Sequence, residues 1–470
     1  MTQTVTLPAW LLAILILFAA WAVLDRLLLP GVRWYLRRRI NRVIDEINTR
    51  LNVEIPAFKL TRRQVLIDRV FHDSRVQAAA ETQAQAEGAP RSVVLRRVDR
   101  YAREIVPSFN AYLYFRVGYW LAKSVARLMY RVRIGYVDEA GLAAVPAGAT
   151  VVFIMNHRSN MDYVLVAFLA AERVALSYAV GEWARIWPLQ TLIRSMGAYF
   201  VRRNSGDPLY RVVLQRYVMM ATESGVTQAV FPEGALSLDG RLREPRLGLL
   251  DYMVKAFDPQ GERDLVFVPV GINYDRVLED RSLLLRLDAD AARPGMLRAA
   301  AIATGFLLKN LGMMLAGRWY RLGYACVNFG RPISMRAYTG AQGLEFRALT
   351  DAQRHPKVAS LAAELMREVG QIVPALPVSL VAQVFVRDPQ RAFSELELKS
   401  EVHRLIGRLE AGGAHVYVPR QDHDYAIGVG LRMLTLRRIV RERDGLYSAN
   451  ASETRILAYY ANAIAHLRAT

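Results

Sequence analysis

Cysteine is almost absent from this chain. One cysteine, Cys326, occurs in 470 residues, so a disulfide bond within the chain is excluded. No second histidine or cysteine lies near His157 at the spacing of metal ligands, and we therefore predict no metal site. The chain also lacks internal repeats and low-complexity tracts, which leaves an ordinary folded protein as the starting hypothesis.

Acidic residues are also in short supply. The chain has 43 aspartates and glutamates against 62 lysines and arginines, which gives a formal net charge of +19. Such an excess indicates an anionic partner: a nucleic acid, a membrane surface or a phosphorylated substrate. No helix-turn-helix, zinc-finger or RNA-binding pattern is present, so we predict no nucleic-acid partner. Most of the excess is arginine, whose planar fork suits phosphate.

One long hydrophobic run is present, at the amino terminus. Residues 7–24 contain no charged side chain and are numerous enough to cross the hydrocarbon core of a bilayer. Basic residues follow this run and none precedes it, which argues against a cleaved signal peptide and leaves the remainder of the chain on the cytoplasmic side. We expect a transmembrane anchor at residues 1–30, and the alternative is a core helix of a soluble domain.

The rest of the chain divides into three predicted regions. Residues 31–105 are basic and mainly helical, with a linker near 79–90. Short apolar strands then alternate with helices, which predicts an α/β domain at 106–335 with a mixed sheet flanked by helices. A mainly helical domain is expected at 336–470. The strand candidates are 151–154, 198–201, 228–231, 265–270 and 324–329.

An amphipathic stretch at residues 98–131 mixes aromatic residues with arginines and lysine. This composition fits a helix that lies at a membrane surface. A helix packed on a protein core has a similar pattern, so both interpretations stay open.

The most informative motif is His157 followed by Asp162. It lies between a predicted buried strand and a predicted helix, with Ser159 or Asn160 as the N-cap. A carboxylate in the first helical turn stays ionised beside the helix dipole. It can hold one imidazole nitrogen and leave the other as a general base. The alternative is a purely structural turn with a capping aspartate.

Three further segments stand at predicted strand ends. The first ends in Arg202 and Arg203, of which one should face a site because side chains alternate along a strand. The second contains Glu233 and Gly234, where glycine allows close approach of the backbone to a ligand. The third is the strand and polar turn at residues 266–275. A basic loop, residues 240–248, follows the second segment.

In this order, the motif and the three segments resemble the four sequence blocks of the glycerolipid acyltransferases. The match covers about residues 106–335. Arg158 and the Arg202–Arg203 pair are similar to the glycerol-3-phosphate acyltransferase branch of that family. The segments 374–382, 391–398 and 459–466 are also similar to the carboxy-terminal region of that branch.

The resemblance implies a membrane enzyme that moves a fatty acyl group from a thioester to the sn-1 hydroxyl of glycerol 3-phosphate. The donor is acyl-CoA or acyl-carrier protein, the product is lysophosphatidic acid, and the reaction begins phospholipid synthesis. We expect no cofactor, contact with membrane lipid, and a single-pass location in the inner (cytoplasmic) membrane. His157 and Asp162 are the expected catalytic residues. The expected substrate-binding residues are Arg158, Ser159, Arg202, Arg203, Glu233, Gly234, Arg241, Arg243, Arg246 and Pro269.

One departure from the family pattern leaves the acceptor open. The third block of that branch usually reads Glu-Gly-x-Arg-Ser-Arg, but this chain has Leu236 and Leu238 in place of both arginines. In the family those arginines help to hold the acceptor's phosphate. Arg241 and Arg246 match another basic pattern of the family and are candidates to replace them. Lysophosphatidate and dihydroxyacetone phosphate remain alternative acceptors, and a non-catalytic, membrane-tethered lipid-binding protein remains a further alternative.

Overall fold

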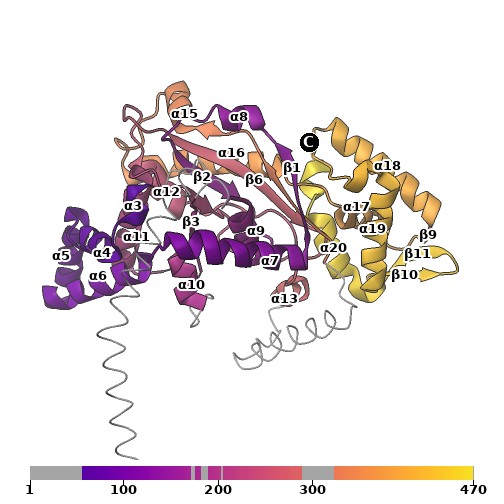
Figure 1. The fold of residues 1–470 in the computed structure, drawn as a ribbon, viewed down its shortest axis with the longest axis horizontal. Helices are drawn as coiled ribbons and strands as arrows, with labels where there is room; N and C mark the ends of the chain where they lie inside the picture. Colours follow the sequence, from indigo (N-terminus) through magenta and orange to yellow (C-terminus); the bar gives the residue numbers. More distant parts are fainter. Residues whose placement is uncertain (1–55, 171–174, 182–188, 203–204, 288–321, 469–470) are drawn as a thin grey trace, which may run out of the picture.

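The fold is known from a computed structural model (Figure 1). It describes residues 56–170, 175–181, 189–202, 205–287 and 322–468. The predicted anchor at residues 1–30 lies outside this part of the chain. Within it, no helix combines the length and apolar character needed to span a membrane.

A mixed eight-stranded sheet forms the centre of the molecule, as predicted. Its strand order is β1-β7-β6-β2-β5-β3-β4, and β8 pairs with β6. The pairs that β6 makes with β7 and β8 are antiparallel and the others are parallel. The strands are β1 (Arg131–Val137), β2 (Thr150–Met155), β3 (Ser177–Val180), β4 (Tyr199–Phe200), β5 (Gln228–Val230), β6 (Leu265–Tyr274), β7 (Tyr324–Phe329) and β8 (Ile333–Ser334). All strand candidates from the sequence are confirmed, whereas β1, β3 and β8 had not been anticipated.

Strand β2 lies in the middle of the sheet, between β6 and β5. Its side chains alternate between two hydrophobic clusters: Val152 and Ile154 belong to one, and Met155 belongs to the other. Both faces of the sheet are therefore covered, which explains why the strand is a continuous apolar run.

Helices cover the first face of the sheet. The hydrophobic cluster there joins the sheet to the amino-terminal helices and to α11, α12 and α16. The helices up to the end of α16 are α3 (Ala57–Leu60), α4 (Arg63–Phe71), α5 (Ser74–Glu87), α6 (Arg91–Ile105), η2 (Leu113–Gly118), α7 (Tyr119–Met129), α8 (Glu139–Ala143), α9 (Met161–Ala170), α10 (Leu189–Ser195), α11 (Pro208–Glu223), α12 (Gly248–Ala256), α13 (Asp280–Leu285), α15 (Met335–Gln342) and α16 (Asp351–Gln371).

The linker predicted near residues 79–90 is instead mostly helical. Helix α5 runs to Glu87 and ends at Gly88, whose φ of 59° is left-handed. Ala80 and Ala84 are buried on the side of this helix that packs into the cluster. Alanine and glutamine are good helix formers, so the composition that suggested a linker also favours a helix once tertiary contacts are available.

The carboxy-terminal region is mainly helical, as predicted. It contains α17 (Pro377–Arg387), α18 (Glu395–Ala411), η4 (Pro419–Gln421), α19 (His423–Leu436), η5 (Ala451–Glu453), α20 (Thr454–Asn462) and η6 (Ala465–Arg468). A small antiparallel sheet of β9 (Phe393–Ser394), β10 (Val440–Arg443) and β11 (Leu446–Ala449) was not anticipated from the sequence.

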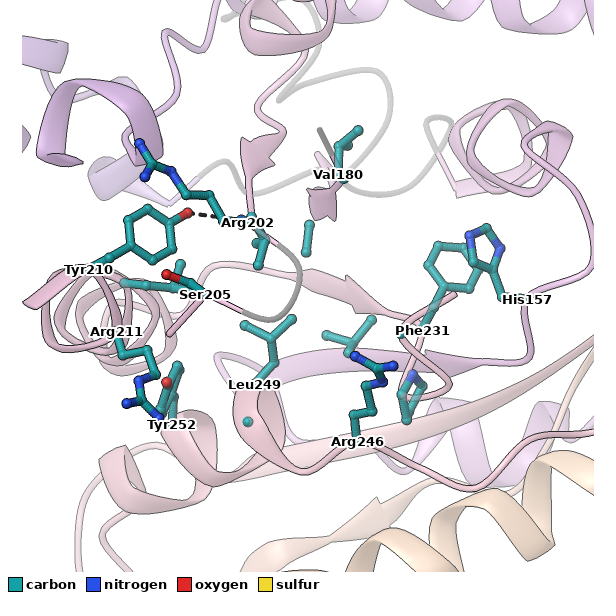
Figure 2. A pocket seen from close by; sticks show the side chains of 18 of the residues that line it. His157, Val180, Arg202, Ser205, Tyr210, Arg211, Phe231, Arg246, Leu249 and Tyr252 are labelled. Atoms are coloured by element: carbon teal, nitrogen blue, oxygen red, sulfur yellow. Dashed lines mark hydrogen bonds between the residues drawn. The ribbon is translucent and has the colours of Figure 1, made fainter. Parts of the chain in front are cut away.

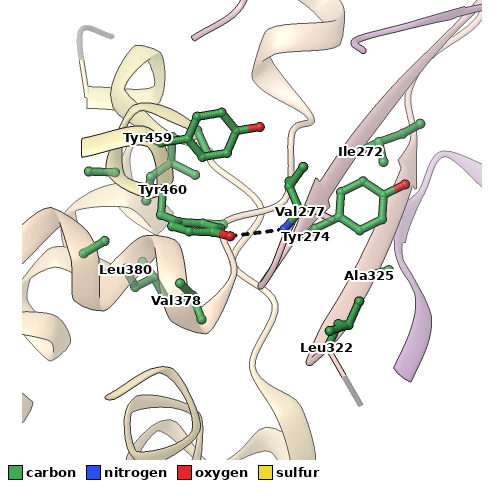
Figure 3. Packing of buried hydrophobic residues seen from close by; sticks show 14 of the residues in the cluster. Ile272, Tyr274, Val277, Leu322, Ala325, Val378, Leu380, Tyr459 and Tyr460 are labelled. Carbon is green, nitrogen blue, oxygen red and sulfur yellow. Dashed lines mark hydrogen bonds between the residues drawn. The ribbon is translucent and has the colours of Figure 1, made fainter. Parts of the chain in front are cut away.

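This region shares a core with the second face of the large sheet. Figure 3 shows Tyr459 and Tyr460 of α20 beside Tyr274 of β6 and Val277, which follows that strand. The Tyr460 hydroxyl accepts a hydrogen bond of 3.2 Å from the Val277 amide. The carboxy-terminal helices are thus packed against the strand ends that carry the candidate site.

Candidate active site

The histidine motif forms a tight turn between β2 and α9. His157 follows the end of β2, and α9 begins at Met161. The Ser159 hydroxyl accepts a 3.1 Å hydrogen bond from the Met161 amide, so Ser159 caps the helix as predicted. Asp162 then occupies the first turn, where the helix dipole favours its negative charge.

Asp162 is fully buried, and hydrogen bonds fix its carboxylate. The Oδ2 atom accepts from the amides of Arg158 at 2.7 Å and Ser159 at 3.1 Å, and it lies 2.9 Å from His157 Nδ1. The Oδ1 atom accepts from the Tyr274 hydroxyl at 2.6 Å. Burial, followed by the charge of Asp162, raises the pKa of Tyr274, so this hydroxyl remains a donor.

His157 lines a cavity. Its ring stacks on Phe231 with 4.1 Å between centroids, and the edge of Tyr163 lies against it at 5.4 Å. Among the described residues, Nε2 has no hydrogen-bond partner, although it is buried. An imidazole with Nδ1 held by a carboxylate and Nε2 uncommitted is arranged as a general base.

The cavity beside His157 encloses about 290 Å³. Figure 2 shows the aliphatic side chains of Val180 and Leu249 within it, with His157 and Phe231 at one end and Arg211 and Tyr252 at the other. The remaining lining residues are Tyr163, Ala179, Gly181, Val201, Arg202, Ser205, Tyr210, Leu214, Val230, Pro232, Gly234, Arg246 and Gly248.

Arg246 stands nearer to the histidine than Arg211 does in Figure 2, and it is exposed. Its amide donates a 2.8 Å hydrogen bond to the Pro232 carbonyl, which ties the basic loop to the turn after β5. Gly234 has a φ of 68°, and a Cβ added there would lie 2.6 Å from Arg246 Cδ. Glycine at this position therefore leaves room for the arginine beside the turn.

Glu233 links two turns beside the cavity through hydrogen bonds. Its two carboxylate oxygens accept from the amides of His157 at 2.9 Å and Arg243 at 3.2 Å. Burial raises the pKa of Glu233 to about 7, against the opposing effect of these amide hydrogen bonds. Glu233 is not among the cavity-lining residues, and its contacts join the histidine turn to the basic loop.

Arg158 does not reach the cavity. Its guanidinium is buried and donates to the carbonyls of Gly240 and Ala463, the latter at 3.0 Å. A Cβ at Gly240 would lie 2.0 Å from the Tyr459 carbonyl oxygen, so the basic loop touches α20 directly. Arg158 thus connects the histidine turn, the basic loop and the carboxy-terminal region.

Several other predicted binding residues also have partners in the protein outside the cavity. Ser159 donates to Glu279 at 2.7 Å, and Arg243 donates to the Leu236 carbonyl at 3.3 Å. Arg241 is exposed and lies 3.9 Å from Asp239. Pro269 is in β6 where its neighbour changes from β8 to β7. Pro269 pairs with Ile154 of β2, but no ladder pair joins it to β7 or β8 on its other side, so the missing N–H of proline costs little.

Of the arginine pair after β4, Arg202 lines the cavity wall and Arg203 lies outside the described residues. Glu104 on α6 binds the Arg202 guanidinium with distances of 2.9 Å and 2.6 Å. That guanidinium also lies 5.0 Å from the ring centres of Tyr101 and Tyr210. The charge of Arg202 is therefore largely matched within the protein.

The two leucines of the third block face the core. Leu236 is buried and Leu238 packs against the same hydrophobic cluster, and neither lines the cavity. Sequence reasoning missed Arg211, Tyr252 and the link from Tyr274 to Asp162. Arg211 lies in the helical pattern of α11, where an arginine ordinarily signals a solvated face, so no sequence signal marked it.

The described residues hold no group of three or more histidine, cysteine, aspartate or glutamate side chains that suits a metal ion.

Two family models match the chain. Residues 137–273, which include the first three blocks and most of the fourth, match a model described as acyltransferase. Residues 310–470 match the glycerol-3-phosphate acyltransferase C-terminal region. The chain is similar to the bacterial glycerol-3-phosphate acyltransferases. The resemblance predicted from the sequence blocks is thereby confirmed.

Curated relatives in several bacteria are named glycerol-3-phosphate acyltransferase. The glycerol-3-phosphate acyltransferase of Xanthomonas campestris is 26% identical over 447 residues, which covers 92% of this chain and 48% of the relative. That of Aeromonas hydrophila is 25% identical over 419 residues, covering 87% and 50%. The chain spans about half the length of these relatives. A solved structure of the 1-acyl-sn-glycerophosphate (LPA) acyltransferase PlsC from Thermotoga maritima is 16% identical, covers 54% of this chain and 78% of that one, and has a TM-score of 0.31.

Proposed function

We propose that this chain transfers a fatty acyl group from a thioester to the sn-1 hydroxyl of glycerol 3-phosphate and so releases lysophosphatidic acid. The observation that supports this most directly is His157, which lines the cavity. Its Nδ1 is held by a buried aspartate, and its Nε2 has no hydrogen-bond partner among the described residues. The named activity of the relatives points to the same chemistry.

In this mechanism the substrate alcohol is the nucleophile. His157 Nε2 takes the hydroxyl proton as the hydroxyl oxygen forms a bond to the thioester carbonyl carbon. The carbon–sulfur bond then breaks, and the thiolate takes the proton back from the imidazolium. Asp162 stabilises the imidazolium and holds the ring in one orientation, as the aspartate of a serine-protease triad does.

The cavity lining suits both substrates of such a reaction, the acyl donor and the phosphorylated acceptor. Aliphatic residues such as Val180, Leu214 and Leu249 offer an apolar surface to an acyl chain. Arg246 offers a guanidinium to a phosphate, and charge-assisted bidentate contacts are the strongest that a phosphate makes with a side chain. Acyl-CoA and acyl-carrier protein both remain candidate donors.

A direct assay tests the acceptor. The purified full chain is incubated with one acyl-CoA and, in turn, labelled glycerol 3-phosphate, dihydroxyacetone phosphate and lysophosphatidate. We expect the highest kcat/KM with glycerol 3-phosphate. A preference for either of the other acceptors would replace the substrate but keep the chemistry of His157. Absence of transfer to all three acceptors, from both donor types, would favour a non-catalytic lipid-binding protein.

We also propose an inner-membrane location, with an anchor at residues 1–30 and a second contact through η2 and α7. Val117, Trp120, Leu121 and Leu128 share one helical face and are exposed, Trp120 by 63%. The basic residues of this segment, Arg116, Lys123 and Arg127, flank that face. An apolar face flanked by basic side chains is typical of a helix that lies at an anionic membrane surface.

Fractionation tests this location. Deletion of residues 1–30 should leave part of the protein on membranes, and Trp120→Gln in that background should release more of it. Leu396→Gln is the matched control, because Leu396 is 78% exposed on α18, outside this segment. Complete solubility of the deletion variant at low salt would contradict the second contact.

A further inference from the structure

A second cavity lies among the carboxy-terminal helices, which Figure 1 shows in yellow and orange. It encloses about 330 Å³, and none of its lining residues also lines the cavity beside His157. Its walls come from the end of α17, the loop before β9, and α18. The lining residues are Gln383, Val384, Arg387, Asp388, Arg391, Phe393, Glu401, Arg404, Leu405 and Arg408.

Positive charge dominates this cavity. Four arginines line it against two acidic residues, Asp388 and Glu401. Arg404 and Arg408 lie one turn apart on α18, a spacing at which like charges repel each other. A concentration of arginines around a hollow is therefore unfavourable until an anion enters it.

Internal ion pairs account for only part of this charge. Arg404 lies 2.6 Å from Glu401, and Arg391 lies 3.2 Å from Glu397. Within the described part of the chain, neither Arg387 nor Arg408 forms an ion pair. Arg408 uses only Nε, which donates to the Arg404 carbonyl at 3.3 Å, so its two terminal nitrogens remain for a ligand.

The floor of the cavity is rigid. Phe393 is buried, and the Arg391 guanidinium lies over its ring at 4.6 Å. Leu405 and Val384 are also buried, and Gln383 donates to the Ala461 carbonyl at 2.6 Å. Arg387, Arg404 and Arg408 thus lie on packed helices around the cavity, and Arg391 lies in the loop between them. The cavity volume reaches the lower range of small-molecule sites, about 300 Å³.

We propose that this cavity binds a small phosphate-bearing anion, with Arg387 and Arg408 as the principal contacts. Arginine forks match phosphate oxygens in pairs, and the arrangement from two helices and a loop can hold a ligand from several sides. The residues that line the cavity include no histidine, and the proposal concerns binding alone. This inference does not rest on the proposed acyl transfer.

Calorimetric titration of the full chain with pyrophosphate tests the site. All proteins carry Arg246→Gln, so that anion binding through Arg246 beside His157 does not contribute. Adding Arg387→Gln or Arg408→Gln should raise the dissociation constant about tenfold or more, because one charge-assisted contact is lost. Arg432→Gln, an exposed arginine of α19 outside the cavity, should leave binding unchanged. Neither Arg387 nor Arg408 forms an ion pair within the described residues, so its replacement leaves no acidic side chain without a partner. Thermal melting of each variant checks that it is folded.

A second titration distinguishes the sources of the phosphate. Dihexanoyl phosphatidate presents a lipid headgroup in soluble form. Tighter binding of pyrophosphate identifies a soluble ligand, and tighter binding of the phosphatidate identifies a headgroup, provided that Arg387→Gln weakens it in each case. The proposal is overturned if neither compound binds saturably, or if the Arg387 and Arg408 variants bind as the Arg432 variant does.

Discussion

The cavity beside His157 and the cavity of the carboxy-terminal helices have similar volumes, about 290 Å³ and 330 Å³, and both have arginines in their walls. They differ in what is buried next to them. The first has aliphatic walls and a histidine whose partner carboxylate is wholly enclosed. The second has charged walls and no such pair.

This difference separates reactive chemistry from binding. A general base needs one fixed orientation, and Asp162 is fixed because the surrounding amides and Tyr274 use its oxygens. An anion site needs only positive charge at a suitable distance. The arginines that line the two cavities therefore mark places of binding, while the buried hydrogen bonds around His157 mark the place of reaction.

The largest effect should follow removal of the base. His157→Ala should lower kcat by about two to four orders of magnitude, because proton transfer in the transition state loses its acceptor. His403→Ala is the control: this histidine also contacts an aspartate, Asp424 at 3.0 Å, but the pair is exposed. Pyrophosphate binding to the carboxy-terminal cavity should be unaffected by either change. Near-normal turnover in His157→Ala would remove the distinction between the cavities.

Placing the family's arginine at position 236 should destabilise the fold and should not strengthen acceptor binding. Leu236 is 8% exposed within the core, so Leu236→Arg buries an unpaired charge. We expect a loss of about 3 kcal/mol or more in the free energy of unfolding, measured by denaturant titration. Leu396→Arg, at a position 78% exposed, should be nearly neutral. Tighter acceptor binding with unchanged stability in Leu236→Arg would show that position 236 does face the substrate.

The phosphate contact gives the next effect. Arg246→Ala should raise the KM for the acceptor about ten- to a hundredfold and change the KM for the donor much less, because one charge-assisted contact is lost. Arg241→Ala is the matched control, since Arg241 belongs to the same loop and is exposed outside the cavity. Equal effects of the two changes on both substrates would show that the loop acts through its overall positive charge and not through a specific contact of Arg246.

The position of the carboxylate is tested through Tyr274. Tyr274→Phe removes the hydroxyl that donates to Asp162 Oδ1 and should lower kcat about tenfold with little change in KM. Tyr130→Phe provides the comparison, because Tyr130 packs 5.1 Å from the Tyr274 ring but donates to the Arg276 carbonyl. An unchanged kcat in Tyr274→Phe would mean that the amides alone orient Asp162.

The smallest effect concerns pH and Glu233. In the folded protein burial raises its pKa from 4.5 to about 7, so the folded state keeps a proton that the unfolded state loses. Its contribution to stability is therefore present below pH 4.5 and declines as pH rises towards about 7. Glu233→Gln cannot titrate, so the difference in melting temperature between wild type and variant should shrink over this interval. A difference that is constant, or that grows with pH, would contradict the raised pKa.

Local sequence was sufficient for five strands of the large sheet and for the histidine motif. The apolar run before His157 indicated a buried element, and the residue types placed the helix cap at Ser159 or Asn160, of which the structure shows Ser159 accepting from the Met161 amide. The linker near 79–90 was predicted wrongly because its alanines look featureless until α5 is packed against other helices. The roles of the basic residues were harder to predict, since an arginine side chain is long enough to serve a cavity, a carboxylate or a backbone carbonyl.

The sequence by itself determined five strands of the large sheet, the α/β class of the central domain and the pairing of His157 with Asp162, because these depend on periodicity and on contacts five residues apart. Only the tertiary structure decided what Arg158 and Arg246 do. Arg158 bonds to carbonyls 82 and 305 residues away, whereas Arg246 borders the cavity. Contacts over such separations depend on how helices and strands pack, and the residue types alone do not encode which distant group a guanidinium will meet.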